Sequence, residues 1–406
     1  MRPEDLRALV PLLAPHTYLD SASTSLKPAP VLDAVRAYYE TLGANVDRGA
    51  HGLGSEATEA YARARAQVAQ RLLGAPADEL VLTRNATEAL NLLAWALGRE
   101  AVDGAPVLAW RPRDVILTTI FEHHSNLLPW QRLARDAGAE LRVLRPRGAA
   151  LDPADFAMRA QVRVVALQHA SNVTGHLHDV RAIAARVRRE HPGALVVVDG
   201  AQAAGHTPVD VGALGVDAYA FAGHKGPLGP QGTGGLWVRR PLLDRLPPFL
   251  LGGGTVADVQ EHRHVLRAEA HRRLEGGTPD VGGAVGLAEG ARLVAEVIGL
   301  DRVHAHERAL AAQLREGLQG LGAQLVGPSD VGVVSFNLPG WGCHDLALAL
   351  DKERIAVRSG HHCALPLARF LGTLDASGGT VRASFHYYNT AEDVERLLGA
   401  LRGLAR

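Results

Sequence analysis

The chain has 406 residues, of which 47% are hydrophobic and 21% are charged, and its 43 basic residues balance 43 acidic ones. This length and composition are typical of a globular protein with a large core and two domains. A balanced charge argues against a nucleic-acid or membrane-surface partner, and no apolar run approaches transmembrane length. Because two cysteines cannot form a disulfide framework, we expect a reducing, cytoplasmic setting.

The N-terminal part of the chain is predicted to be mainly helical. We expect a short amphipathic helix over 1–15, a helix over 31–42 and a third over 55–73. Ser55 is placed as the N-cap of the third helix, because serine hydroxyls accept the free N–H groups of a first helical turn. The loop before that helix carries Arg48 among its polar residues.

A strand, a tight turn and a helix follow at 79–84, 85–87 and 88–97. At a helix N-terminus the free backbone N–H groups and the helix dipole can bind an anion such as a phosphate. Thr87 can add a hydroxyl to that site. Ordinary N-capping by Asn85 or Thr87 explains the same residues, and the two interpretations are compatible.

Two further strands, at 114–119 and 162–168, deliver polar residues to the same edge of a sheet. After the first strand comes His123, which can stack on an aromatic ring or move protons near neutral pH. A metal site at His123 and its neighbour is not favoured, because adjacent histidines rarely face one ion and no third ligand has suitable spacing. After the second strand comes Asn172, a candidate hydrogen-bond donor or a simple turn residue.

Two buried strands that end in charged residues carry the main functional signal. The strand at 194–199 ends in Asp199, and the strand at 216–222 is followed by Gly-His and Lys225. The alternation of strands with helices such as 179–190 predicts a mostly parallel sheet, whose carboxyl edge binds ligands. A desolvated lysine beside an acid fits a pyridoxal phosphate (PLP) site, in which the lysine forms a Schiff base and the acid pairs with the pyridinium nitrogen. The alternatives are a surface lysine and a turn aspartate.

The C-terminal third is predicted to form a smaller α+β domain, because strands and helices no longer alternate there. We assign 16–290 to a large domain, and 1–15 with 291–406 to a small one, linked by a helix over 283–298. The segment 226–235 is too rich in glycine and proline to be a helix or strand and is expected to be a loop. The glycine-rich loops at 250–255 and 275–280 are expected at the ligand edge or at an interface. The elements expected after 300 are helices at 301–321, 344–351 and 390–404 and strands at 324–327, 331–337, 354–357 and 380–385.

Cys363 is the second predicted centre of chemistry. Arg358, His361 and His362 surround it in the sequence, and cationic neighbours raise the thiolate fraction of a cysteine. The flanking glycine and proline predict an exposed loop. The alternative, an inert small hydrophobic residue, fits Cys343 better because an acid and few cations lie near it. A disulfide between the two is not expected in the cytosol.

These motifs together resemble the class V aminotransferase-fold enzymes, and among them the SUF-associated type II cysteine desulfurases and selenocysteine lyases. The resemblance extends from Tyr18 to the C-terminal helix. The matching segments are YLDSA (18–22), RGAH (48–51), RNATE (84–88), EHHSN (122–126), SNVTG (171–175), DGAQ (199–202), GHK (223–225), GGTP (276–279), RSGHHC (358–363) and RAS (382–384).

The resemblance implies an α/β fold of PLP-dependent fold type I, with a seven-stranded, mostly parallel sheet, a smaller α+β C-terminal domain and a homodimer. Its implied cofactor-binding residues are Lys225, Asp199, Gln202, His123, Thr87, Ala86, His224 and, toward the partner subunit, Thr278. Its implied substrate-binding residues are Asn172, Arg382, Arg358 and His362. Its implied catalytic residues are Lys225, Cys363 and His123, and no metal is implied.

The implied reaction converts L-cysteine to L-alanine and leaves sulfur as a persulfide on Cys363. An acceptor protein or a small thiol then takes the sulfur for iron–sulfur or other sulfur biosynthesis, and L-selenocysteine is a further expected substrate. The alternatives are an aminotransferase, epimerase, β-lyase or selenocysteine lyase without sulfur transfer, or a non-catalytic scaffold. Two departures stand out: Ala222 replaces a family serine or threonine, and the loop 226–235 is longer by one residue.

Overall fold

The structure is a computed structural model that describes residues 1–47, 51–146 and 150–404. Its largest sheet has seven strands, in the order β2, β8, β7, β6, β5, β3, β4. Strand β8 runs in the direction opposite to the other six strands, and every pair that does not include β8 is parallel. The predicted mostly parallel sheet is therefore confirmed. The strand bounds are β2 Leu80–Thr83, β3 Asp114–Thr119, β4 Glu140–Leu144, β5 Gln161–Gln168, β6 Leu195–Asp199, β7 Ala218–Ala222 and β8 Gly234–Val238.

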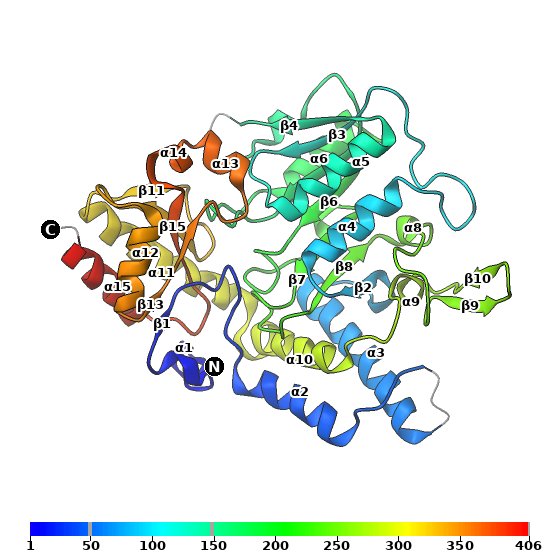
Figure 1. The fold of residues 1–406 in the computed structure, drawn as a ribbon, viewed down its shortest axis with the longest axis horizontal. Helices are drawn as coiled ribbons and strands as arrows, with labels where there is room; N and C mark the ends of the chain where they lie inside the picture. Colours follow the sequence, from blue (N-terminus) through cyan, green and yellow to red (C-terminus); the bar gives the residue numbers. More distant parts are fainter. Residues whose placement is uncertain (48–50, 147–149, 405–406) are drawn as a thin grey trace.

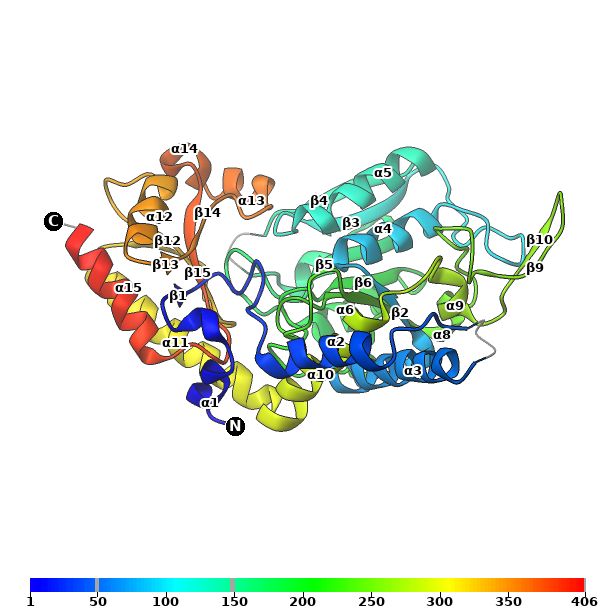
Figure 2. The ribbon, with the colours of Figure 1, turned by 60° about the horizontal axis from the view of Figure 1, so that its bottom comes forward.

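Helices cover both faces of this sheet (Figures 1 and 2). Alternate strand residues point to opposite faces, so the two sides form separate cores. Helices α4 (Ala86–Leu97) and α5 (Leu128–Ala137) pack on one face. The other face is covered by α3 (Gly52–Leu73), α6 (Val180–Glu190) and α10 (Val281–Arg292). Burial on both sides explains why β6, β7 and the middle of β5 are mostly apolar in sequence.

A second, four-stranded sheet lies at the other end of the molecule (Figure 2). Its order is β11 (Gln324–Val326), β12 (Val333–Asn337), β15 (Thr380–Ser384), β14 (Arg358–Gly360), and all its pairs are antiparallel. Its apolar core includes residues of α11, α12 and α15. These helices span Leu300–Gly320, Cys343–Lys352 and Ala391–Leu404.

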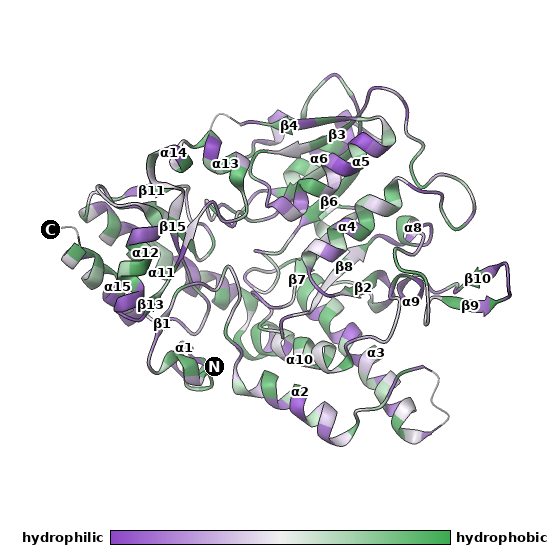
Figure 3. Cartoon of the chain, in the orientation of Figure 1, coloured by the Kyte–Doolittle hydropathy of each residue, from purple (hydrophilic) through white to green (hydrophobic). Residues whose placement is uncertain are grey.

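A long helical connection joins the two parts of the chain. Helix α10 continues through a π-helical segment, Leu293–Ile298, into α11 after Gly299. Figure 3 colours α10 mostly green and white, in keeping with the burial of most of its residues. The short strand β1 (Thr17–Tyr18) pairs with β13 (Ile355–Ala356). The division into two domains near residue 290 stays a prediction.

The remaining elements are shorter, apart from the helix α2. They are α1 Pro3–Ala8, α2 Ala29–Thr41, α7 Val211–Leu214, α8 Arg240–Leu243, α9 Ala270–Leu274, α13 Leu365–Phe370, α14 Thr373–Ser377, the hairpin strands β9 Val256–Val259 and β10 His264–Leu266, and the 3-10 turns Pro11–Leu13, Ala77–Glu79, His124–Asn126 and Pro153–Phe156. Within the described ranges, no helix is both long and apolar enough to cross a membrane.

Three local predictions are wrong. The N-terminal helix over 1–15 is interrupted, because Pro11 starts a separate 3-10 turn after α1 ends. Helix α3 begins before Ser55, and its cap is His51, whose Nδ1 accepts the N–H of Gly54 at 3.1 Å. The last two glycines of the loop 226–235 belong to β8, where a Cβ on Gly235 would lie 2.5 Å from the Phe221 ring. Close packing against β7 therefore requires glycine there.

A buried ion pair fixes α3 to the loop that follows α9. The Arg65 guanidinium pairs with the Glu275 carboxylate, which also accepts the Leu82 N–H at 2.7 Å and the Tyr61 hydroxyl at 2.8 Å. The two charged side chains are only 7% and 10% exposed. Such a pair is costly to break from one side, because the remaining charge stays buried and unpaired.

We expect Glu275→Ala to reduce the free energy of unfolding by about 3–5 kcal/mol, measured by urea denaturation. The matched control is Glu59→Ala, because Glu59 pairs with Arg63 on the exposed face of α3 and such pairs contribute about 0–1 kcal/mol. Equal destabilisation by the two substitutions would contradict the importance of the buried pair.

Candidate functional site

A cavity of about 220 Å³ opens at the carboxyl edge of the large sheet and is closed on one side by the C-terminal sheet. It brings together twelve of the thirteen predicted site residues. They are Ala86, Thr87, His123, Asn172, Asp199, Gln202, His224, Lys225, Arg358, His362, Cys363 and Arg382. The parallel strands explain this gathering, since β5, β6 and β7 all end at the same edge.

Lys225 follows β7, is half-buried and lines the cavity. Desolvation lowers the pKa of Lys225 to about 8, although the Asp199 carboxylate opposes the shift. Burial also raises the pKa of Asp199, while the Ala201 N–H and the Lys225 charge lower it. Lys225 can therefore hold or release a proton near neutral pH.

His123 lines the same cavity, and hydrogen bonds hold the turn in which it lies. Its Nδ1 accepts the Ser125 N–H at 3.1 Å, which leaves the ring proton on Nε2. The preceding Glu122 accepts hydrogen bonds from Thr119 at 2.5 Å and Asn126 at 2.6 Å. Burial, then the charge of Lys225, lowers the pKa of His123 to about 3. The ring is therefore uncharged at neutral pH, which suits stacking on an aromatic cofactor.

The N-terminus of α4 also borders the cavity. Asn85 caps the helix by accepting the Glu88 N–H at 2.8 Å, so the predicted capping by Asn85 is confirmed. The Thr87 hydroxyl lies 2.7 Å from the Ser125 hydroxyl. His224 places Nδ1 3.1 Å from the Thr24 hydroxyl, and burial lowers the pKa of His224 to about 4. Helix N–H groups, hydroxyls and a neutral imidazole fit a phosphate group.

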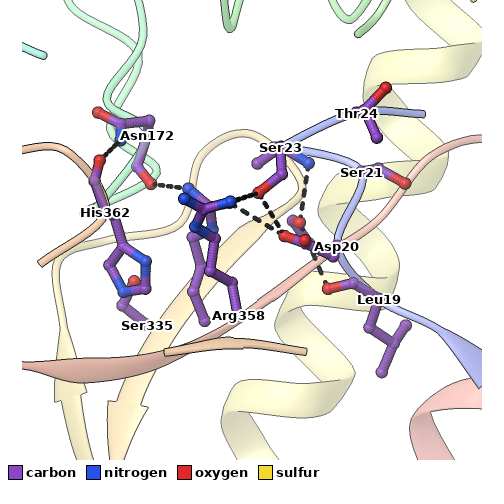
Figure 4. Close-up of polar contacts among 12 residues, drawn as sticks. Leu19, Asp20, Ser21, Ser23, Thr24, Asn172, Ser335, Arg358 and His362 are labelled. Atoms are coloured by element: carbon purple, nitrogen blue, oxygen red, sulfur yellow. Dashed lines mark hydrogen bonds and ion pairs between the residues drawn. The ribbon is translucent and has the colours of Figure 1, made fainter. Parts of the chain in front are cut away.

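Arg382 reaches the cavity from the C-terminal sheet. Its guanidinium donates to the Asn172 carbonyl at 3.0 Å and to Ser23 and Asp20 at 2.8 and 3.1 Å. Figure 4 shows Asn172, Ser23 and Asp20 in this contact, with Arg358 beside them. Arg358 donates to the Ser23 hydroxyl at 3.0 Å. Two cationic side chains thus face the cavity from its C-terminal side.

Four buried polar atoms of cavity-lining residues have no hydrogen-bond partner within the described part of the chain. They are Nε2 of Gln168, Oδ1 of Asn172, Nδ1 of His362 and Nε of Arg382. Buried polar groups in native proteins are normally paired, so these atoms indicate a polar ligand. Together with the lysine, the acid and the phosphate-binding end, they fit PLP with an amino-acid substrate. Gln168 and Ser125 were not identified from the sequence, because side-chain types alone do not reveal an unpaired amide or a hydroxyl pair.

Cys363 lies between β14 and α13, in a bend where Cys363 and His362 have φ values of 57° and 50°. The bend is held at its backbone, since the Cys363 carbonyl accepts the His124 N–H at 2.7 Å. The predicted exposed loop is wrong in detail, because the thiol is half-buried and lines the cavity. Cys343 is buried in the core of the second sheet, where burial raises the pKa of its thiol. Both cysteines are free.

His362 is not the cation that the sequence suggested. Its side chain is 4% exposed, and desolvation followed by the charge of Arg382 lowers the pKa of His362 well below its usual range. Its Nε2 lies 2.8 Å from the Thr380 hydroxyl, and its carbonyl accepts the Asn172 amide at 2.7 Å. Among the described residues that line the cavity with Cys363, Arg358 and Arg382 are therefore the permanent positive charges.

Two predicted features lie elsewhere. Thr278 lines two other cavities, of about 260 and 270 Å³, with residues of α3 and the 275–280 loop, and it does not face Lys225. Its predicted role concerns the partner subunit and stays a prediction. Arg48 lies outside the described residues.

A buried histidine–glutamate group behind Lys225 was also not identified from the sequence. His206 Nδ1 lies 3.0 Å from both Glu307 oxygens, and His386 Nε2 lies 3.0 Å from the Gly226 carbonyl. Burial raises the pKa of Glu307 to about 8 and lowers that of His206 to about 4. The group links α11 and the end of β15 to the backbone just after the lysine.

The chain matches the model of the class V aminotransferase family over residues 17–397. A probable cysteine desulfurase of Pyrococcus abyssi is 44% identical, with 100% of this chain and 98% of that protein covered. The apo structure of a cysteine desulfurase from Thermococcus onnurineus is also 44% identical, with a TM-score of 0.93 over 100% of this chain and 98% of that one. A cysteine desulfurase structure from Escherichia coli is 33% identical, with a TM-score of 0.88 and 99% and 98% covered. The chain therefore belongs to the class V aminotransferase family, and the predicted family and fold are confirmed.

The chain has only three lysines, Lys27, Lys225 and Lys352. A labelling experiment can therefore identify the lysine that binds PLP without ambiguity. Lys27 is the main rival, because burial lowers its pKa to about 7. Its Nζ, however, donates to the His224 carbonyl at 2.9 Å and does not line the cavity. We expect borohydride reduction of the PLP-loaded protein to attach the cofactor to Lys225 alone, as mapped by peptide mass spectrometry. Lys225→Ala should abolish the adduct and Lys27→Met should keep it, whereas an adduct on Lys27 or Lys352 would refute the assignment.

Proposed function

We propose that this protein is a PLP-dependent cysteine desulfurase that converts L-cysteine to L-alanine and retains the sulfur on Cys363. The main observation behind this proposal is that Lys225 and Cys363 line the same cavity, together with Arg382 and Asn172. The full-length similarity to proteins named cysteine desulfurases supports the same reaction.

The residues of the cavity divide into a cofactor half and a substrate half. Asp199, Gln202, His123, Thr87 and His224 would hold PLP, which when bound accepts electron density from the substrate Cα. Asp199, an acid at a strand end, would pair with the ring nitrogen, and the uncharged His123 ring would stack on the cofactor. The amine of Lys225, whose pKa is about 8, takes the Cα proton and can return a proton to the product.

The substrate half is built to bind a small amino acid. The buried Nε of Arg382 and Oδ1 of Asn172 have no hydrogen-bond partner among the residues that the structure describes, so a substrate carboxylate and amine, respectively, can use them. The neighbouring arginine, Arg358, adds a second positive charge at the exposed rim. Charge-assisted hydrogen bonds of this kind orient a carboxylate strongly.

The Cys363 thiolate would attack the sulfur of the bound substrate. The Cβ–S bond of the substrate breaks as the S–S bond forms, and the carbon fragment gains a proton to become alanine. The products are alanine and a Cys363 persulfide, so atoms and electrons balance without another reagent. An aminotransferase, epimerase or β-lyase on this fold has no need of a thiol in the cavity, and the position of Cys363 favours the desulfurase over them.

The proposal extends to partners and location. The half-buried Cys363 would pass its sulfur to an acceptor protein or a small thiol in a reducing, cytoplasmic setting, in keeping with two free cysteines. Thr278 would complete the phosphate site of a second subunit, which supports a homodimer. L-selenocysteine would react in the same cavity.

We expect Cys363→Ala to retain PLP and to bind cysteine, because Lys225, Asp199 and Arg382 are unchanged. The variant should lose persulfide formation and nearly all alanine release, measured together by mass spectrometry and amino-acid analysis. The matched control is Cys343→Ala, which should keep alanine release largely intact, because Cys343 does not line the cavity. Turnover of cysteine by Cys363→Ala at the parental rate would overturn the role of the thiol.

We expect the PLP-loaded protein to sediment at twice the mass of one chain. The physical reason is that Thr278 and its glycine-rich loop face open cavities away from Lys225 of the same subunit. A monomer with full PLP occupancy in analytical ultracentrifugation would contradict the shared site.

A further inference from the structure

We propose that Ser125 is a cofactor-binding residue whose hydroxyl, paired with that of Thr87, replaces the hydroxyl absent at Ala222. The inference rests on the proposed use of PLP and assigns an additional ligand to its phosphate.

Hydrogen bonds of the Ser125 side chain, of its backbone and of the next residue fix its position. Its Oγ lies 2.7 Å from Oγ1 of Thr87, in the first turn of α4, and both residues line the cavity that contains Lys225. Its backbone N–H donates to His123 Nδ1 at 3.1 Å. The next residue, Asn126, is fully buried and bonded to Glu122 at 2.6 Å. Ser125 is therefore held between the ring-stacking histidine and the helix N-terminus, where the phosphate end is expected.

The hydroxyl pair leaves one proton free for a ligand. Each hydroxyl can donate once, and one of the two donations is used in the bond between them. The hydroxyl that accepts this bond keeps its own proton for another acceptor. A phosphate oxygen beside the free N–H groups of α4 is such an acceptor, and hydrogen bonds to ionised groups are the stronger kind.

Position 222 has no hydroxyl to offer the phosphate, because it is alanine where the family has serine or threonine. It is the last residue of β7, is only 3% exposed and lines the same cavity, but its methyl group cannot donate. The adjacent His224 offers a single ring N–H, because burial keeps its imidazole uncharged. The Ser125–Thr87 pair supplies a hydroxyl donor to the cavity that Ala222 also lines.

The test compares PLP with pyridoxal, which has the same ring and aldehyde but no phosphate. Apoprotein prepared by removing the cofactor is titrated with each compound, and the dissociation constant is read from the absorption spectrum. We expect Ser125→Ala to weaken PLP binding roughly 10- to 100-fold, as for the loss of a hydrogen bond to a charged group, and to leave pyridoxal binding unchanged. Unchanged PLP binding, or equal weakening for both compounds, would overturn the proposal.

Two further variants provide the controls. Ser125→Thr keeps a hydroxyl and should retain parental PLP affinity, which separates the chemistry from the folding of the turn. Adding Ala222→Ser to Ser125→Ala should recover most of the lost PLP affinity, because a hydroxyl returns to the cavity. No recovery would contradict the idea that Ser125 replaces the hydroxyl absent at position 222. Failure of the parent protein to bind PLP at all would instead refute the proposed function.

Discussion

The proposed chemistry depends on the desolvation of one amine, that of Lys225, at the edge of a buried sheet. Lys225 follows a strand whose five residues are all buried, and its ammonium has the carboxylate of Asp199 as its main electrostatic support. Desolvation favours the neutral amine and the carboxylate favours the ammonium, so the balance leaves a pKa of about 8. Because desolvation outweighs the carboxylate, the amine can lose its proton near neutral pH, and it can then form a covalent link and exchange protons.

The surrounding architecture maintains that balance. The segment between β1 and α2 joins the two sheets, since Asp20 and Ser23 bind Arg382 of the second sheet. Gln202 donates to the carbonyl of Ala22 at 2.8 Å. His386, after the end of β15, contacts the carbonyl that follows Lys225. Residues nearly the whole chain apart therefore close the cavity around the lysine and bring Cys363 to its rim.

Much of this arrangement could be predicted from the sequence. Strands β2, β3, β5, β6 and β7 were located within two residues at each end from their apolar runs, and parallel strands necessarily place Asp199 and Lys225 at one edge. Strands β4 and β8 were not predicted. The short strand β14 and helix α13 beside Cys363 were not predicted, because three to six residues carry no clear periodicity. His362 was expected to be charged, and only its burial shows otherwise. Which side chains pair across long distances, such as His206 with Glu307, depends on packing that no local pattern encodes.

The central claim is that Lys225 and Cys363 act on one substrate in one cavity. It is tested most directly by a single turnover of the PLP-loaded protein with limiting L-cysteine, followed by alkylation and mass spectrometry of the Cys363 peptide. The account predicts one alanine released for each sulfur atom found on Cys363. Release of pyruvate, ammonia and free sulfide, with an unmodified Cys363, would contradict it.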